Sequence, residues 1–300
     1  MSAADMVALF EKLSGHQPGL RKAHARGICA SGEFIPARGT PFDEAALLSQ
    51  GTLPVTLRYS LGGGNPNADD RSPGTRGVGI QMTLPDGTRH NFTGNNFPVF
   101  AGKDPATFYG LLQTFLPDEN GKPNPAKTRA YAAEHPSVRA HLAWQQQSKP
   151  AASFANNTFN GIHTFYYTPD KGAKIKYRWQ LTPDAGELYL TDDERTSLPK
   201  NYLDKKLASE LDDAPVTYTL TATLGTPEDT DTDPSQQWPA DRQTVTLGTV
   251  KVTDSGGEAC TPVNFDPNVL SKGFASSDDP VLRMRSPAYA ISYGKRLSGN

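Results

Sequence analysis

Cysteine is scarce in this chain of 300 residues, which contains only Cys29 and Cys260. Two cysteines exclude the disulfide framework that holds many small secreted domains together, and they exclude a zinc cluster built on cysteine. Whether the two form a single bridge stays open at this point. The redox compartment in which the protein works stays open with it.

Long apolar runs and blocks of basic residues are also missing. No stretch approaches the ~20 apolar residues that cross a bilayer, so we expect no membrane span. The first fifteen residues, MSAADMVALFEKLSG, have the pattern of an amphipathic helix with acidic residues, unlike a basic and apolar signal peptide. The 30 Lys and Arg residues against 32 Asp and Glu residues give a net charge of −2, and we expect no nucleic-acid partner.

The sequence does contain many segments with the alternation of β-strands, and its 27 Gly and 25 Pro residues suit a protein of strands and loops. In the last of these segments the apolar phase shifts across Gly248, which predicts a β-bulge. Such a set of strands would supply most of a barrel. Period-two alternation is clearest at 52–60, 77–84, 162–168, 173–181, 216–224 and 244–253, and 89–100 offers further strands that Pro98 limits.

Helices are expected around these strands. Asp104 and Pro105 have the residue types of a helix cap and a first helical position. Residues 225–243 are acidic and proline-rich, which predicts an exposed loop between two strands. The helical segments lie at about 4–14, 104–115, 125–146 and 280–297.

Two segments carry polar residues where apolar ones are usual. In TLPVTLRYS at 52–60, alternation places Arg58 and Ser60 on one face, and a buried guanidinium needs an anionic partner unless that face sees water. In RSPAYAISYGKR at 285–296, a helix would align Arg285, Tyr289, Tyr293 and Arg296 in one stripe. The stripe is either a solvated face near a terminus or the wall of a binding site.

Several motifs, taken in order, resemble the haem catalases and most of all the short catalase-related peroxidases, also called minimal catalases. RKAHARG resembles the distal-histidine motif, and LRYSLGGGNPNADDRSPGTRG resembles the strand and loop that follow it. GNNFPVF with KDPATF resembles the distal-asparagine segment, and HTFYY with DPVLRMRSPAY resembles the proximal side. The resemblance covers about 20–298. It implies an α+β fold, in which residues 1–300 form a single haem-binding domain with a closed, mostly antiparallel eight-stranded β-barrel and surrounding helices.

The resemblance also implies a cofactor, haem b, lodged between the barrel and the helix at 280–297. Tyr289 would be the axial ligand of the iron, bound as a phenolate that Arg285 stabilises by a hydrogen bond. Arg285 would contact His163, which would contact Asp279, and this relay would adjust the negative charge on the ligand. The haem propionates would pair with Arg21, Arg58 and Arg296.

On the opposite, distal side, the resemblance gives catalytic roles to three residues. His24 would move a proton between the two oxygens of a bound peroxide, Asn95 would orient the peroxide, and Ser60 would fix the tautomer of His24. Phe100 and Phe108 would form aromatic walls around the haem.

The predicted function is a haem peroxidase that uses organic hydroperoxides or hydrogen peroxide to oxidise small organic donors, with weak catalase activity. The reason is length: large catalases build their narrow access channel partly from segments that this chain lacks. Two alternatives stay open, a fatty-acid hydroperoxide isomerase or lyase of the allene-oxide-synthase kind and a non-catalytic barrel that carries haem or another small ligand. We expect a monomer or homodimer, which is periplasmic if a leader has been removed and otherwise cytoplasmic.

Overall fold

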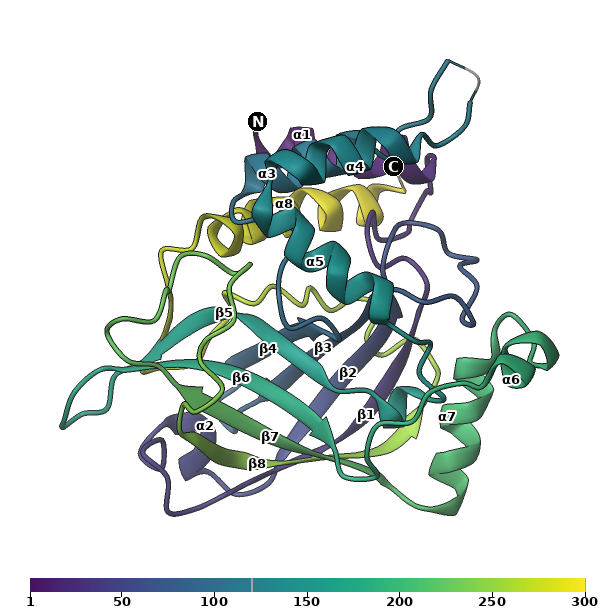
Figure 1. Ribbon diagram of the computed structural model, residues 1–300. Coiled ribbons are helices and arrows are strands. Elements are labelled where there is room, and N and C mark those ends of the chain that lie inside the picture. The colour runs from purple at the N-terminus through teal and green to yellow at the C-terminus, as the bar shows by residue number, and fades with distance from the viewer. Residues whose placement is uncertain (120, 300) are drawn as a thin grey trace.

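The computed structural model describes residues 1–119 and 121–299, and its centre is a closed antiparallel barrel (Figure 1). The strands follow the order β4-β3-β2-β1-β8-β7-β6-β5, and a pairing of Asn95 with Asn160 joins β4 to β5 and closes the ring. A short ninth strand pairs with the second half of β5. The strands are β1 (Gly27–Pro36), β2 (Leu53–Leu61), β3 (Arg76–Thr83), β4 (Arg89–Asn95), β5 (Phe159–Tyr167), β6 (Ile175–Pro183), β7 (Val216–Leu224), β8 (Thr244–Ser255) and β9 (Phe274–Ser276).

The eight-stranded barrel confirms the predicted fold class, and each of the six clearest segments forms a strand. The bulge is also where the sequence placed it, because the β7–β8 register shifts between Leu220 and Thr221, opposite Gly248. Strand β1 was not expected, since its small residues hide the alternation. One of them, Gly32, lies so close to β8 that a Cβ atom would be 2.0 Å from the carbonyl oxygen of Lys251.

The barrel interior is a packed core rather than a ligand cavity. Large side chains from alternate strand positions fill it, and rings such as those of Tyr59 and Phe154 stack with centroids 5.0 Å apart. The hydroxyl of Tyr59 donates to that of Tyr218, which donates to the carbonyl oxygen of Phe154, so the buried phenols are satisfied. A ligand must therefore bind outside the barrel.

Helices gather over one side of the barrel (Figure 1). Helix α8 (Pro280–Ser298) lies between the barrel and a layer that includes α1 (Ala3–Ser14), α3 (Pro105–Gln113) and α4 (Pro125–Glu134). Asp104 caps α3 and Pro105 is its first residue, as predicted. The remaining helices are α2 (Ala46–Ser49), α5 (Pro136–Gln147), α6 (Asp192–Ser197) and α7 (Tyr202–Asp213), with a short 3₁₀ turn, η1 (Phe154–Asn156).

Two sequence predictions were wrong in detail. The helix expected at 125–146 is two helices, because His135 precedes a proline and takes an extended backbone, which ends α4 before Pro136 begins α5. The loop at 225–243 is only partly exposed, since it packs on β6, where Arg178 donates to the carbonyl oxygen of Gln236 at 2.6 Å. Among the described helices, none combines the length and the apolar character needed to cross a membrane.

Candidate active site

A cavity lies between the outer face of β2–β4 and helix α8. Its empty volume is about 1010 Å³, part of it open to solvent. Nine of the residues that the sequence singled out line it: Arg21, His24, Arg58, Ser60, Asn95, Arg285, Tyr289, Tyr293 and Arg296. The other four, Phe100, Phe108, His163 and Asp279, lie outside the lining.

Helix α8 presents one continuous stripe to this cavity. Arg285, Tyr289, Tyr293 and Arg296 recur at helical spacing, and the small residues Ala288 and Ser292 between them also line the wall. The Nη2 atom of Arg285 donates to the phenol oxygen of Tyr289 at 2.6 Å. The stripe is therefore the wall of a cavity and not a solvated face.

The N-cap residue of α8, Asp279, connects this helix to the barrel. Asp279 caps the helix through Oδ1, which accepts from the backbone N–H of Val281 at 2.8 Å, and its Oδ2 lies 2.6 Å from Nδ1 of His163 on β5. Burial lowers the pKa of His163 although the bond to Asp279 opposes it, and the charge of Arg285 lowers it further. His163 is therefore neutral at pH 7 and donates its Nδ1–H to Asp279.

Three arginines converge at one end of the cavity. Arg21 donates to the carbonyl oxygens of Cys260 and Val263 at 3.2 and 2.8 Å, and Arg58 donates to that of Ala25 at 3.0 Å. Burial lowers the pKa of Arg21 to about 9, and repulsion from Arg58 and Arg296 adds to the shift. Burial likewise lowers the pKa of Arg58 to about 10, with Arg296 contributing.

This arginine cluster, Arg21, Arg58 and Arg296, has an excess of positive charge with no anion to match. Among the described residues, the charged neighbours that shift the pKa values of these three arginines are arginines and tyrosines. No carboxylate of a described residue is among them. The Nη2 atom of Arg296 is buried and has no hydrogen-bond partner within the described part of the chain. Because an unpaired buried cation is costly, this end of the cavity is built for an anion.

His24 lies on the wall opposite α8, in a strained backbone conformation with φ of 55°. Its Nδ1 is 3.0 Å from Oγ of Ser60, and that hydroxyl donates to the carbonyl oxygen of Gly77 at 3.5 Å. The hydroxyl therefore accepts from Nδ1–H, which leaves Nε2 of His24 unprotonated. Burial, followed by the charges of Arg58, Arg285 and Arg21, lowers the pKa of His24 to about 4.

Asn95 ends β4 beside this histidine. It pairs with Gly77 across the β3–β4 ladder, so β3 brings Asn95 and Ser60 to neighbouring strand positions. The side-chain oxygen of Asn95 accepts from the backbone N–H of Phe97 at 2.8 Å, which fixes the orientation of the amide. The amide nitrogen is then the group that Asn95 offers as a donor on the cavity wall.

The predicted aromatic walls lie one layer further out. The rings of Phe100 and Phe108 are 4.7 Å apart, and Phe100 lies 6.4 Å from the imidazole of His163. The cavity wall itself is made by residues that the sequence did not single out, above all Val7 and Phe10 from α1 and Phe265. The apolar face of the N-terminal helix was the only sequence signal for the first two.

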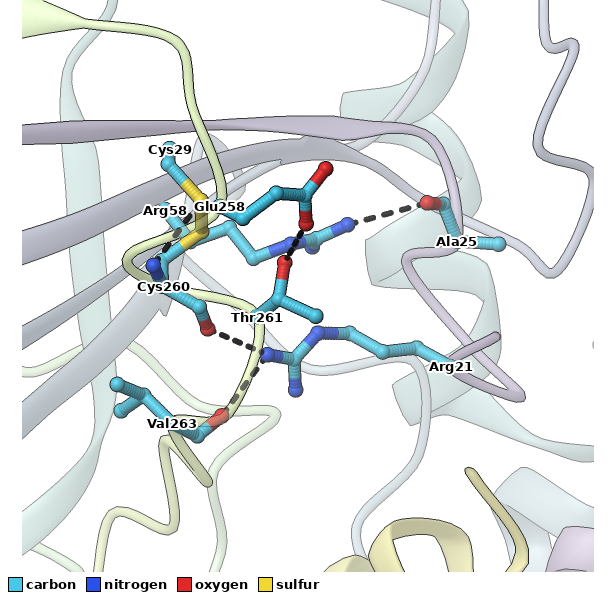
Figure 2. The surroundings of a disulfide bond; sticks show 8 residues. All are labelled: Arg21, Ala25, Cys29, Arg58, Glu258, Cys260, Thr261 and Val263. Carbon is cyan, nitrogen blue, oxygen red and sulfur yellow. Dashed lines mark hydrogen bonds between the residues drawn. A yellow bond between two sulfur atoms is a disulfide. The ribbon is translucent and has the colours of Figure 1, made fainter. Parts of the chain in front are cut away.

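The two cysteines form a disulfide beside the arginine cluster (Figure 2). Cys29 lies on β1 and Cys260 in the segment between β8 and β9, with their Cα atoms 5.3 Å apart. Both are buried. The pairing that the sequence left open is therefore present in the structure.

The sequence is similar to that of known proteins. The sequence model of the Catalase family matches residues 9–300. A catalase-related peroxidase of Synechococcus elongatus is 37% identical, with 98% of this chain and 88% of the relative covered. A catalase-related peroxidase of Mycolicibacterium paratuberculosis is 32% identical, with 93% and 89% covered.

Solved structures of catalases share the fold. Catalase A from Saccharomyces cerevisiae superposes with a TM-score of 0.83 at 19% identity, over 98% of this chain and 64% of that one. A bacterial catalase gives a TM-score of 0.82 at 18% identity, over 98% and 60%. The match of the family model to nearly all of the sequence and the two relatives above 30% identity lead to one conclusion: the chain belongs to the catalase family.

Proposed function

We propose that this chain is a haem peroxidase, which binds haem b in the cavity and reduces hydroperoxides with electrons from small organic donors. Membership of the catalase family supports haem as the cofactor and peroxide as a substrate. The names of the two relatives, both catalase-related peroxidases, support peroxidase chemistry over a dedicated catalase.

The residues of the cavity fit haem at both of its chemically distinct parts. The arginine cluster lacks an anion, and the unpartnered Nη2 of Arg296 would be satisfied by a carboxylate, so the cluster would hold the two propionates. Tyr289 offers a phenol oxygen, and the hydrogen bond from Arg285 stabilises that oxygen as an anion, the form that binds ferric iron. Bound haem would supply the redox chemistry, because it can accept the two oxidising equivalents of a hydroperoxide and pass them to a donor.

His24 would carry the proton transfer. Its Nδ1 is held by Ser60 and the residue lines the cavity, so the unprotonated Nε2 would accept the proton from one oxygen of a hydroperoxide. It then returns the same proton to the other oxygen, which leaves as an alcohol, or as water from hydrogen peroxide. Because the pKa of His24 is about 4, the base form is present throughout the neutral range.

The other polar groups would orient the hydroperoxide and His24, and would tune the charge on Tyr289. Asn95 would donate its amide N–H to the hydroperoxide and hold it within reach of His24. Ser60 would keep His24 in the productive tautomer. On the proximal side, His163 with its partner Asp279 would act on Arg285 electrostatically, since the charge of Arg285 acts on His163, and would so adjust the charge on the phenol oxygen of Tyr289.

One observation carries this proposal: His24, held as a base by Ser60, shares a cavity with the Arg285–Tyr289 pair. A carrier of haem has no use for a proton acceptor in that place, and the packed barrel interior leaves no room for a ligand there. The geometry does not favour an isomerase or lyase over a peroxidase, because both would use the same bond-breaking groups.

The test uses the purified protein loaded with haem. We expect the absorption spectrum of five-coordinate ferric haem with phenolate ligation, which Tyr289→Phe should abolish or weaken. tert-Butyl hydroperoxide should react rapidly and drive the oxidation of a small aromatic donor, and His24→Ala should slow the reaction with peroxide by ~10²-fold or more. An unchanged rate in His24→Ala would favour a carrier. Rearranged products from a fatty-acid hydroperoxide without donor oxidation would favour an isomerase.

A further inference from the structure

Residues 256–266, here called the strap, lead from the end of β8 across the arginine cluster to the outer face of the barrel. Asn264 and Phe265 line the cavity. Two strand residues anchor this end of the strap, because Thr93 donates to the carbonyl oxygen of Phe265 at 2.8 Å and Asn91 to that of Asp266 at 2.9 Å. The strap is thus a structural part of the cavity wall.

The middle of the strap is fixed by the disulfide (Figure 2). Cys260 bonds to Cys29 on β1, and the backbone N–H of Gly256 donates to the carbonyl oxygen of Cys29 at 2.8 Å. The two sulfurs pack with Phe265 in a small buried cluster. With 5% and 1% of their surfaces exposed, Cys29 and Cys260 are shielded from solvent, as suits a permanent bond.

This one covalent bond connects the supports of two arginines. Cys29 lies directly opposite Arg58 in the β1–β2 register. Cys260 supplies one of the two carbonyl oxygens that accept from Arg21 (Figure 2). The strap also accepts a hydrogen bond at 3.0 Å from the hydroxyl of Tyr293, on the cavity-lining stripe of α8, through the carbonyl oxygen of Pro262.

The arginines need such a support. Arg21 and Arg58 are half-buried cations that repel one another, and the two hydrogen bonds that hold Arg21 go to neutral carbonyl groups of the strap. Such bonds stabilise a guanidinium only if their acceptors stay in place. A strap free to move would let Arg21 swing away from the charge of Arg58.

We propose that the Cys29–Cys260 disulfide is a clamp that positions Arg21 beside Arg58 so that the arginine cluster can receive the carboxylates of the cofactor. The inference rests on the proposed function, because it assumes that haem is the group received. Both cysteines are positioning residues, since they act on the cofactor through Arg21.

The first experiment removes the clamp with the double variant Cys29→Ala, Cys260→Ala. In the cofactor-free protein, amide hydrogen exchange should become faster in the strap and stay unchanged in the rest of the barrel. In the haem-loaded protein, haem should transfer to apomyoglobin on the order of tenfold faster than from the wild type. Thr261→Ala is the matched control, because it removes a hydrogen bond between the strap residues Glu258 and Thr261 and leaves the clamp in place.

Two further readouts separate positioning from general loosening. The transfer of haem with both propionates methylated should proceed equally fast from the wild type and from the double variant, because no carboxylate is left for Arg21 to hold. Arg21→Gln should accelerate the transfer of ordinary haem when it is made in the wild type, and it should add little in the double variant. The reason is that removing Arg21 and removing the disulfide both abolish the same interaction, that of Arg21 with a propionate. Additive effects, or equal acceleration with the methylated haem, would overturn the proposal.

The outcomes also distinguish the clamp from the proposed function. If the wild type takes up no haem, the proposed function fails, and the exchange measurement still shows whether the disulfide holds the strap. If haem binds and the double variant keeps wild-type exchange and transfer rates, the clamp alone fails. Should the double variant not fold, the wild type is reduced with a dithiol until thiol titration finds both shielded cysteines free; the dithiol passes two electrons and two protons to the sulfurs and becomes a cyclic disulfide. The reduced protein should then show the same changes, and their absence would contradict the clamp.

Discussion

Gly77 lies against His24 so closely that a side chain at this position would displace the imidazole. A Cβ atom on Gly77 would be 2.8 Å from Cε1 of His24 and 2.9 Å from Oγ of Ser60. Because His24 and Ser60 are themselves 3.0 Å apart, a methyl group here would push between the base and the hydroxyl that fixes its tautomer. The absence of one side chain on β3 therefore shapes the proposed proton-transfer site.

The first prediction is that Gly77→Ala slows the reaction with hydroperoxide by ~10²-fold, the usual contribution of a well-placed acid–base group. Haem binding should persist, because Tyr289 and the arginine cluster lie elsewhere on the wall. Stopped-flow absorption with tert-butyl hydroperoxide measures the rate. Gly51→Ala is the control, since a Cβ there meets no atom within 4 Å. A wild-type rate in Gly77→Ala would show that His24 tolerates displacement and does not act as the base.

The second prediction concerns the pH dependence of the same reaction. Burial and three arginines lower the pKa of His24 from 6.5 to about 4, so the base form is complete above about pH 5. The rate should be level from pH 5 to 8 and fall as pH decreases through 4. In Arg58→Gln one of the charges that lower the pKa of His24 is lost, and the acid limb should move to higher pH. If the rate of the wild type fell instead with a midpoint near pH 6.5, His24 would be exposed to solvent.

The sequence predicted the barrel well because alternation is a local signal that each strand carries by itself. It missed β1, where Gly27 and Gly32 interrupt the pattern for a reason that lies in other strands: a Cβ on either would overlap the backbone of a neighbour. It also predicted one helix over 125–146, although Pro136 is a local signal for a break between two helices. Non-local packing, rather than weak propensity, explains why β1 was missed.

The candidate site was predicted through motifs. The residues of the site that the prediction missed were missed for the same reason as β1, because they depend on contacts between distant segments. Arg285 and Tyr289 are four residues apart on one helix, so their contact follows from helical geometry. The roles of Phe10 and Phe265 depend on segments far apart in the chain meeting at one cavity. The disulfide could not be derived either, because a separation of 231 residues says nothing about distance in the fold.

The third prediction concerns stability in acid. His90 is fully buried in the core beside Phe92 and Phe274, and burial lowers its pKa to about 3. A histidine whose pKa is lower in the folded than in the unfolded state stabilises the fold fully above 6.5, and this contribution is lost as pH falls below 6.5. Each such residue lowers the free energy of unfolding by roughly 1.4 kcal/mol for each pH unit of acidification in that range. Urea unfolding between pH 7 and 4.5 should therefore show a falling free energy, with a shallower slope in His90→Phe. Equal slopes would mean that His90 is not buried as a neutral ring.

The fourth prediction separates the two roles of Asp279, which caps α8 and accepts from His163. Asn is also a good N-cap, so Asp279→Asn should change the free energy of unfolding by no more than ~1 kcal/mol. The loss of the carboxylate removes the anion that holds the Nδ1–H tautomer of His163. In the other tautomer the proton is on Nε2, which then acts as a hydrogen-bond donor. Arg285, itself a donor, would then lose its fixed position beside Tyr289.

In the haem-loaded protein, Asp279→Asn should therefore shift the charge-transfer bands and change the reduction potential, since the hydrogen bond that Arg285 donates to the phenol oxygen of Tyr289 would change. Asp104→Asn provides a matched control, because Asp104 caps α3 in the same way and has no histidine partner among the described residues. That control should lose a similar amount of stability and keep the wild-type spectrum. If Asp279→Asn lowered stability and left both the spectrum and the potential unchanged, Asp279 would be a helix cap alone and the proximal relay would end at Arg285.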